Sequence, residues 1–170
     1  MVEETPAPIT VTTIEAGVRL SLRTADSEGA GKALGHPLPT KIGTITEAGQ
    51  RLALALGPDE WMLTAPAGDG WEGLADRSPI KEPHSLVGVG DRELVIVVEG
   101  DGAADALSAG CPRDVEAMAV GCGARTVFDG VGIVLLKRAA HRFEIHVWRS
   151  YAPHVLHLLA VVQEELEAGL

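Results

Sequence analysis

Residues 33–37 read Ala-Leu-Gly-His-Pro, and residues 108–112 read Ser-Ala-Gly-Cys-Pro, an offset of 75 from His36 to Cys111. Carried backward along the chain, the offset of 75 pairs Leu20 with Val95 and Leu22 with Val97. Further along the chain the offset becomes 82, which pairs Trp61 with Phe143. The agreement is in pattern more than in identity, so chance agreement is the alternative. Solenoid repeats run to about 20–50 residues. A repeat of this length therefore predicts two similar halves and not a solenoid.

Composition narrows the class of protein. The chain has 170 residues, 46% hydrophobic and 4% aromatic, so its core must be built from aliphatic side chains. The net charge of −10 disfavours nucleic acid and anionic membrane surfaces as partners, because both need a basic footprint. No apolar run reaches the roughly 20 residues that span a bilayer. The opening Met1-Val-Glu-Glu-Thr-Pro lacks the basic and apolar regions of a secretory signal, so we expect a cytoplasmic protein with a flexible tail over residues 1–15.

The first half shows strand patterns around one helix. Val18–Arg23 alternates with period 2, Lys41–Thr46 is a weaker strand candidate, and Arg51–Leu56 and Trp61–Ala65 flank a Gly-Pro-Asp turn that predicts a hairpin. Ser27–Leu34 is a helix candidate that ends at Gly35. Residues 66–85 are rich in Gly and Pro and predict a connector, with a short helix at 71–76.

The second half repeats this order more clearly. Strands are predicted at 93–98, 124–128, 133–137 and 142–148, and Asp129-Gly130 is a typical hairpin turn. Asp101 is a candidate N-cap for a helix at 102–109, and Ser150 for a final helix. In that final helix an apolar stripe recurs at helical spacing: Val155, Leu158, Leu159, Val162 and Leu166.

These patterns predict an α+β fold in which helices cover one face of antiparallel sheet. We expect a single domain over residues 16–168, made of two similar halves at about 16–80 and 85–168. No long alternation of strand and helix favours a Rossmann arrangement.

The sequence gives little indication of a phosphate-binding site or a metal site. Gly29-Ala-Gly31 precedes no strong helix and Gly121-Cys-Gly123 precedes a strand, so both are expected to be turns and not phosphate loops. Cys111 and Cys122 have no Cys-x-x-Cys spacing, and His154 and His157 lack a fixed acidic partner. We expect no cofactor and no metal in this chain.

Nucleophilic and acid–base sites are equally weak. Cys111 follows a predicted helix end and does not lie at a helix N-terminus that would lower its pKa, so a buried thiol is the preferred interpretation. Asp59-Glu60 lies in a hairpin turn, where exposure is normal. We expect no catalytic residue.

Tryptophan offers the best candidate for an interaction site. Trp61, Trp71 and Trp148 either fill the core or anchor a protein–protein interface, where Trp and Arg are enriched. If Phe143, Ile145 and Val147 face the core, alternation places Trp148 outside. Our candidate interface is the strand-to-helix corner formed by Trp148, Arg149 and Tyr151.

Four segments in order resemble one known family. They are Leu56-Gly-Pro-Asp-Glu-Trp61, Gly110-Cys-Pro-Arg-Asp-Val115, Val120-Gly-Cys-Gly-Ala-Arg-Thr126 and Phe143-Glu-Ile-His-Val-Trp-Arg-Ser-Tyr-Ala152. Together they resemble the gamma subunit of heterotetrameric sarcosine oxidase over about residues 50–160. One departure is Val87-Gly-Val-Gly-Asp-Arg92, where the family commonly has an Asp and a His, so any role of those two residues is in doubt here.

The resemblance implies a fold related to the folate-binding domain of glycine-cleavage aminomethyltransferase. It implies alpha, beta and delta subunits as partners, with FAD, FMN, NAD, tetrahydrofolate and zinc carried by those subunits. The implied function is a non-catalytic role in oxidising sarcosine. Two alternatives stay open: a stand-alone folate-dependent aminomethyl-transfer protein, and the same subunit role in a complex that demethylates another N-methyl amine.

Overall fold

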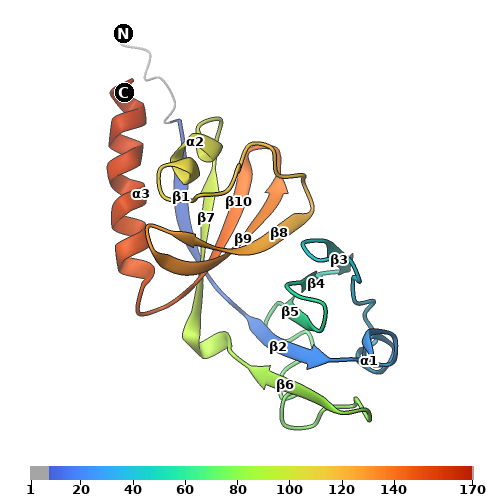
Figure 1. Cartoon of the computed structure of the whole chain (residues 1–170). Helices are drawn as coiled ribbons and strands as arrows, with labels where there is room; N and C mark the ends of the chain where they lie inside the picture. The colour runs from blue at the N-terminus through green and yellow to red at the C-terminus, as the bar shows by residue number, and fades with distance from the viewer. Residues whose placement is uncertain (1–7, 170) are drawn as a thin grey trace. The chain divides into compact units, whose positions relative to one another are not determined.

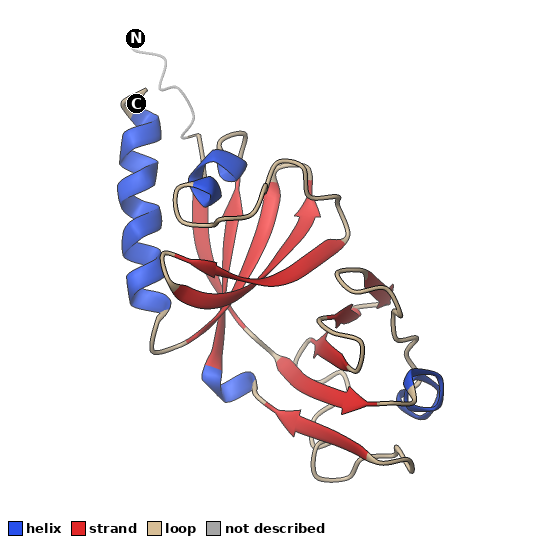
Figure 2. Cartoon of the chain, viewed as in Figure 1, coloured by secondary structure: helices blue, strands red, loops and turns tan. Residues whose placement is uncertain are grey.

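The computed structural model describes residues 8–169, which form two five-stranded antiparallel sheets and a few helices (Figures 1 and 2). The N-terminal unit contains Glu15–Glu93 with Gly121–Ala124. The C-terminal unit contains the chain up to Ile14, Leu94–Val120 and the chain from Arg125. This is the α+β fold class expected from the sequence. No helix among residues 8–169 is long and apolar enough to cross a membrane.

The N-terminal unit contains a sheet with the strand order β3-β4-β5-β2-β6. Its strands are β2 (Val18–Thr24), β3 (Ile45–Ala48), β4 (Arg51–Ala55), β5 (Glu60–Ala65) and β6 (His84–Gly88). The helix α1 (Ser27–Leu34) begins where the Gly29 N–H donates to the Asp26 carboxylate at 2.8 Å, and ends at Gly35 in the left-handed region. The predicted strand β2, hairpin β4–β5 and helix α1 are confirmed, and the Asp26 cap and the Gly35 stop explain the bounds of α1.

The C-terminal unit contains a sheet with the strand order β1-β7-β10-β9-β8. Its elements are β1 (Thr10–Glu15), β7 (Glu93–Glu99), α2 (Ala103–Ser108), β8 (Cys122–Phe128), β9 (Val131–Ala139), β10 (Arg142–Trp148) and α3 (Ala152–Glu167); the 3-10 turn η1 (Gly90–Arg92) precedes β7. Asp129 and Gly130 both have positive φ (46° and 77°), as a two-residue type I′ hairpin turn requires. The predicted β8–β9 turn is therefore confirmed.

The register of the strands confirms the internal repeat. In the β4–β5 pair, Ala55 lies opposite Trp61 and Leu52 opposite Thr64. Adding 82 to each number gives pairs of the β9–β10 ladder, since Lys137 lies opposite Phe143 and Val134 opposite His146. The two hairpins are thus the same substructure with the same register.

The sequence offset of 75 for the preceding strands is wrong by one residue. The Thr24 N–H donates to the Asp59 carbonyl at 3.1 Å, and in the other half the Gly100 N–H donates to the His141 carbonyl at 3.0 Å. The two acceptors differ by 82, as in the hairpins, but the two donors differ by 76. The N-cap of α2 is accordingly Gly102, the counterpart of Asp26, and not Asp101.

A shift of one residue exchanges the faces of a strand. Leu20 and Leu22 lie in the core of the N-terminal unit, whereas the core of the C-terminal unit takes Ile96 and Val98. Val95 and Val97 are on the other face. The paired strands were correctly matched from the sequence, but the paired positions were not.

The first strand of each half belongs to the sheet of the other half. β1 precedes β2 in sequence but lies beside β7, and β6 precedes β7 but pairs with β2. The sequence shows no signal for this exchange, and β6 was not predicted. The flexible tail expected over residues 1–15 is also corrected, because Thr10–Glu15 form β1; residues 1–7 lie outside the described residues.

Three further local predictions differ from the structure. Ser150 does not cap α3, whose N-cap is Tyr151 with no side-chain capping hydrogen bond. Residues 71–76 form turns and not a helix. The strand expected at Lys41–Thr46 begins only at Ile45, because the Thr44 N–H and hydroxyl both donate to the Lys41 carbonyl in a turn.

We expect Ile9→Val to destabilise the protein by about 0.5–1.5 kcal/mol. Ile9 is 1% exposed and packs in the C-terminal core, although it precedes the N-terminal unit in sequence. Hydrogen exchange should lose protection in β7 and β10 and not in β4 and β5. Ile14→Val is the matched control, since Ile14 is 46% exposed; equal effects of the two changes would contradict the exchange of first strands.

Candidate functional site

The candidate interaction corner, residues 148–151, lies where β10 ends and α3 begins. Phe143, Ile145 and Val147 are buried, and Trp148 is 54% exposed, as the alternation of the strand predicts. Tyr151 is 49% exposed and its ring stacks on Trp148, with centroids 6.3 Å apart and an interplanar angle of 27°. Two large aromatic rings are therefore presented together to solvent.

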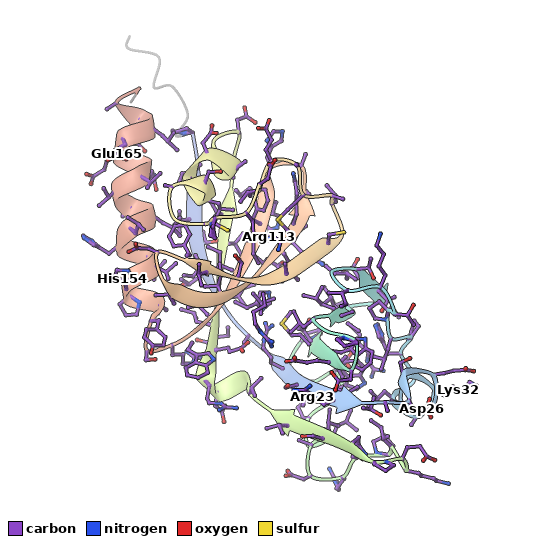
Figure 3. All side chains as sticks on the ribbon, in the orientation of Figure 1. Arg23, Asp26, Lys32, Arg113, His154 and Glu165 are labelled. Carbon is purple, nitrogen blue, oxygen red and sulfur yellow. The ribbon has the colours of Figure 1, made fainter. Side chains whose placement is uncertain are left out.

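Backbone hydrogen bonds fix this corner. The Tyr151 N–H donates to the Trp148 carbonyl at 2.9 Å, and the His154 N–H donates to Tyr151 at 3.1 Å. His154 lies in the first turn of α3 (Figure 3). Its Nε2 is 2.8 Å from Asp129 Oδ2, which ties this turn to the β8–β9 turn. The connection that carries the aromatic pair is thus fixed by its own backbone hydrogen bonds, and the helix that follows it is tied to the β8–β9 turn.

The corner has a basic side chain and a helix N-terminus, and the Asp129 carboxylate lies beside that helix end. Arg149 is exposed, and the first turn of α3 contains no acidic residue. The N-terminus of a helix has a partial positive charge from its unbonded N–H groups.

The other residues singled out from the sequence have structural contacts. Cys111 is buried, with Sγ 3.8 Å from the Thr126 hydroxyl, and Cys122 is a half-buried free thiol. Asp59 accepts from Arg23 at 3.0 Å in the β4–β5 turn. Trp61 donates from Nε1 to the Pro39 carbonyl at 2.8 Å and fills the core.

The glycine and histidine candidates are also placed. The Gly29 N–H is already bonded to Asp26, so it is not open to a phosphate. Gly123 N–H donates to the Gly43 carbonyl at 2.9 Å in a strand contact. His157 is exposed on α3, and within residues 8–169 no group of three or more His, Cys, Asp or Glu side chains is arranged to hold a metal ion.

Sequence reasoning missed a polar cluster on the second face of β10. Glu144 lies 3.5 Å from both Arg138 Nε and His146 Nε2, and the His146 side chain is 3% exposed. Burial acts to raise the pKa of Glu144, but the hydrogen bond and charge of His146, with the charges of Arg138 and Arg142, lower it overall. The alternation of Glu144 and His146 with apolar residues was visible in the sequence, whereas their burial was not.

His36 is a second buried polar residue that the sequence did not identify. It is 1% exposed, its Nε2 lies 3.2 Å from the Thr46 carbonyl, and its ring meets Trp71 edge-on at 5.6 Å. Burial lowers the pKa of His36; the Thr46 hydrogen bond opposes this change and the charge of Arg51 adds to it. The folded protein therefore favours the neutral imidazole.

This preference predicts a pH dependence of stability. In the unfolded chain His36 takes up a proton near pH 6.5, whereas in the folded chain it does so only at a lower pH. The folded state is therefore most stable, as far as His36 is concerned, above about pH 6.5, and it loses stability as the pH falls below that value. One such group contributes at most about 1.4 kcal/mol per pH unit. His36→Phe should reduce the slope of the unfolding free energy between pH 6.5 and 5, measured with urea. An unchanged slope in His36→Phe would contradict the assignment.

Comparison with known proteins places the chain among particular relatives. No protein-family model matches it. It is 26% identical over 148 residues to the sarcosine oxidase subunit gamma of Arthrobacter sp., covering 85% of this chain and 73% of that protein. It is 23% identical over 160 residues to the sarcosine oxidase subunit gamma of Corynebacterium sp. (strain U-96), covering 92% and 78%.

Solved structures agree on the fold. A chain of the heterotetrameric sarcosine oxidase from Corynebacterium sp. U-96 in complex with pyrrole 2-carboxylate superposes with a TM-score of 0.83 at 23% identity, over 92% of this chain and 84% of that one. Glycine cleavage system aminomethyltransferase T from Bartonella henselae gives a TM-score of 0.69 at 16% identity, over 90% of this chain and 45% of that one. Both the fold and the resemblance predicted from the sequence are confirmed.

Proposed function

We propose that this chain is the gamma subunit of a heterotetrameric sarcosine oxidase and has a structural role. The observation that carries the proposal is the similarity to two proteins named sarcosine oxidase subunit gamma, over 85% and 92% of the chain. Its partners are the alpha, beta and delta subunits of such a complex. The complex would convert sarcosine, oxygen and water into glycine, formaldehyde and hydrogen peroxide, or form methylenetetrahydrofolate when tetrahydrofolate is present.

We place the chemistry on the other subunits, with FAD, FMN, NAD, tetrahydrofolate and zinc bound there. The side chains of this chain that could take part in catalysis make contacts with neighbouring side chains that are typical of a structural role. Cys111 meets Thr126, Asp59 pairs with Arg23, and Glu144 lies between Arg138 and His146.

The corner at residues 148–151 is our candidate for the surface that binds a partner subunit. Trp, Tyr and Arg are enriched among the residues that dominate binding energy at interfaces. The exposed stack of Trp148 on Tyr151 beside Arg149 offers such anchors on a rigid strand-to-helix connection. We assign these three residues to the contact with a partner subunit in the cytoplasmic complex.

Co-expression tests the activity of the complex. With the alpha, beta and delta subunits present, adding this chain should raise the yield of a complex that releases hydrogen peroxide from sarcosine. A complex that forms but oxidises another N-methyl amine in preference would favour the related demethylase. Equal yield and activity without this chain would contradict the proposal.

The aminomethyltransferase likeness favours one alternative, a folate-dependent carrier. That function requires the isolated chain to bind tetrahydrofolate. Calorimetry with tetrahydrofolate should give no heat of binding under our proposal. Saturable binding with one equivalent would support the alternative.

A further inference from the structure

Residues 8–15, which we call the arm, leave their own half of the repeat and dock on the sheet of the other half. Within the arm, β1 is the edge strand beside β7 (Figure 1). Ile9 is 1% exposed and lies in the core of the C-terminal unit, and Val11 packs against the same core. The surface that receives the arm is therefore defined by the segment that it already binds.

This surface, the arm site, consists of the edge of β7 with Gly100 and Gly102, and it fits the backbone of the arm closely. The Gly102 N–H donates to the Pro8 carbonyl at 3.0 Å. A Cβ added at Gly102 would lie 3.3 Å from Ile9 Cγ2, and a Cβ added at Gly100 would overlap the Pro8 carbonyl oxygen. The arm site thus suits residues 8–15, and every copy of this chain carries that segment.

The connector between β1 and β2 is only two residues long, Ala16 and Gly17. Gly17 has a φ of 61°, in the left-handed region that residues with a side chain rarely adopt. A Cβ at this position would also lie 2.6 Å from the Ala65 carbonyl oxygen, closer than a real Cβ approaches a backbone atom. The path of the chain from β2 to its own arm site therefore depends on glycine at position 17.

The chain is anchored directly after the connector. The Val89 N–H donates to the Arg19 carbonyl at 2.9 Å, and Arg19 Nε lies 3.1 Å from the Glu93 carboxylate. The Arg19 guanidinium also donates to the Met62 sulfur at 3.2 Å, and the Arg19 side chain is 2% exposed. Since β1 is held beside β7 and β2 is held at Arg19, a change of direction between the two strands is confined to the connector.

We propose that Gly17 is the hinge of an arm exchange, and that the arm site of one copy binds the arm of a second copy when this hinge straightens. The occupant is a second copy because its residues 8–15 are identical to the segment that the site already holds. The arm makes the same contacts in both states, so the balance between them depends on the connector and on protein concentration. The left-handed turn at Gly17 keeps the arm on its own chain. This inference concerns the isolated chain and does not depend on the proposed function.

Gly17→Val tests the hinge. Valine disfavours a positive φ and its Cβ would meet the Ala65 carbonyl, so the connector should become extended and direct the arm away from its own site. Left-handed backbone at a residue with a side chain lowers an equilibrium constant about tenfold, and a dimer relieves two connectors, so the association constant should rise about 100-fold over that of the unchanged chain. Sedimentation equilibrium of the full chain measures this constant.

Gly49→Val is the matched control. Gly49 has a φ of 63°, close to that of Gly17, and lies in the turn between β3 and β4, where an added Cβ has no neighbour within 4 Å. The backbone strain should lower the stability of this variant, but the variant should stay monomeric because its turn does not lead to the arm. Equal dimerisation of Gly49→Val and Gly17→Val would overturn the hinge.

A cysteine pair distinguishes arm exchange from association through another surface. Ile9→Cys and Gly102→Cys place two thiols where the arm meets its site. When ¹⁴N and ¹⁵N chains that also carry Gly17→Val are refolded together and oxidised, disulfides between positions 9 and 102 should join peptides of different isotopes. Without Gly17→Val, each disulfide should join peptides of one isotope. A Gly17→Val dimer whose disulfides all lie within one chain would overturn the proposal.

Refolding gives a measurement that does not need the hinge variant. If Gly17→Val does not fold, the chain with native Gly17 should be unfolded in urea and refolded at high and at low protein concentration. Mass action should yield the arm-exchanged dimer at high concentration and the monomer at low concentration, and the dimer should contain the mixed-isotope disulfide when Ile9→Cys and Gly102→Cys are present. Monomer alone at both concentrations would then overturn the proposal.

Discussion

Trp148→Ala should weaken assembly with the partner subunits by about 30-fold or more while leaving the isolated chain nearly as stable as before. A hot-spot residue contributes about 2 kcal/mol or more to binding. Trp148 is 54% exposed and its ring contacts Tyr151, so little of its area is buried within this chain. The affinity is measurable by surface-immobilised titration of the purified partner subunits.

Val161→Ala is the control for this change. Val161 is also an exposed apolar residue, at 37%, but lies on α3 away from the corner. Tyr151→Ala should act like Trp148→Ala, and the double variant should show a coupling of about 0.5–1.5 kcal/mol, typical of an aromatic pair. A loss of 3 kcal/mol in the stability of Trp148→Ala alone would instead identify the residue as part of the core.

Phe143→Ala should destabilise the isolated chain by about 3–5 kcal/mol, which is enough to unfold a marginally stable protein. Phe143 is 0% exposed, lies in the core of the C-terminal unit, and has Lys137 Nζ above its ring at 5.3 Å. Removing the ring leaves a cavity and also takes away the contact of the buried lysine. Urea unfolding followed by circular dichroism gives the free energy directly.

The repeat supplies the comparison for Phe143. Trp61 is its counterpart in the other half, is 2% exposed, and donates to the Pro39 carbonyl. Trp61→Ala should therefore cost a similar amount. A loss below 1 kcal/mol in either variant would show that the two halves do not use this position in the same way.

The parts of the fold that were predictable depend on local chemistry. The stop at Gly35 and the Asp129-Gly130 turn each act through neighbouring residues, and both appear in the structure, whereas the predicted N-caps Asp101 and Ser150 do not. The exposure of Trp148 also followed from strand alternation alone. Short-range rules were sufficient to predict an element wherever one of its faces is buried and the other is exposed to solvent.

The errors share a different cause. Residues 94–98 are all apolar, so their pattern does not reveal which of them face the core. The offset of 75 came from matching Gly-x-Pro segments that follow helices of unequal length, eight residues in α1 and six in α2. The exchange of β1 and β6 between sheets is a non-local pairing that no local pattern encodes. The buried His146 and His36 were missed because burial of a polar group depends on tertiary packing.

Native mass spectrometry of this chain, tagged and co-expressed with the alpha, beta and delta subunits, tests whether it is a structural subunit of the proposed complex. We expect one heterotetramer containing a single copy of each subunit, which loses this chain selectively when Trp148 is replaced by alanine. Recovery of the tagged chain alone, beside an assembly of the other three that oxidises sarcosine at full rate, would contradict it.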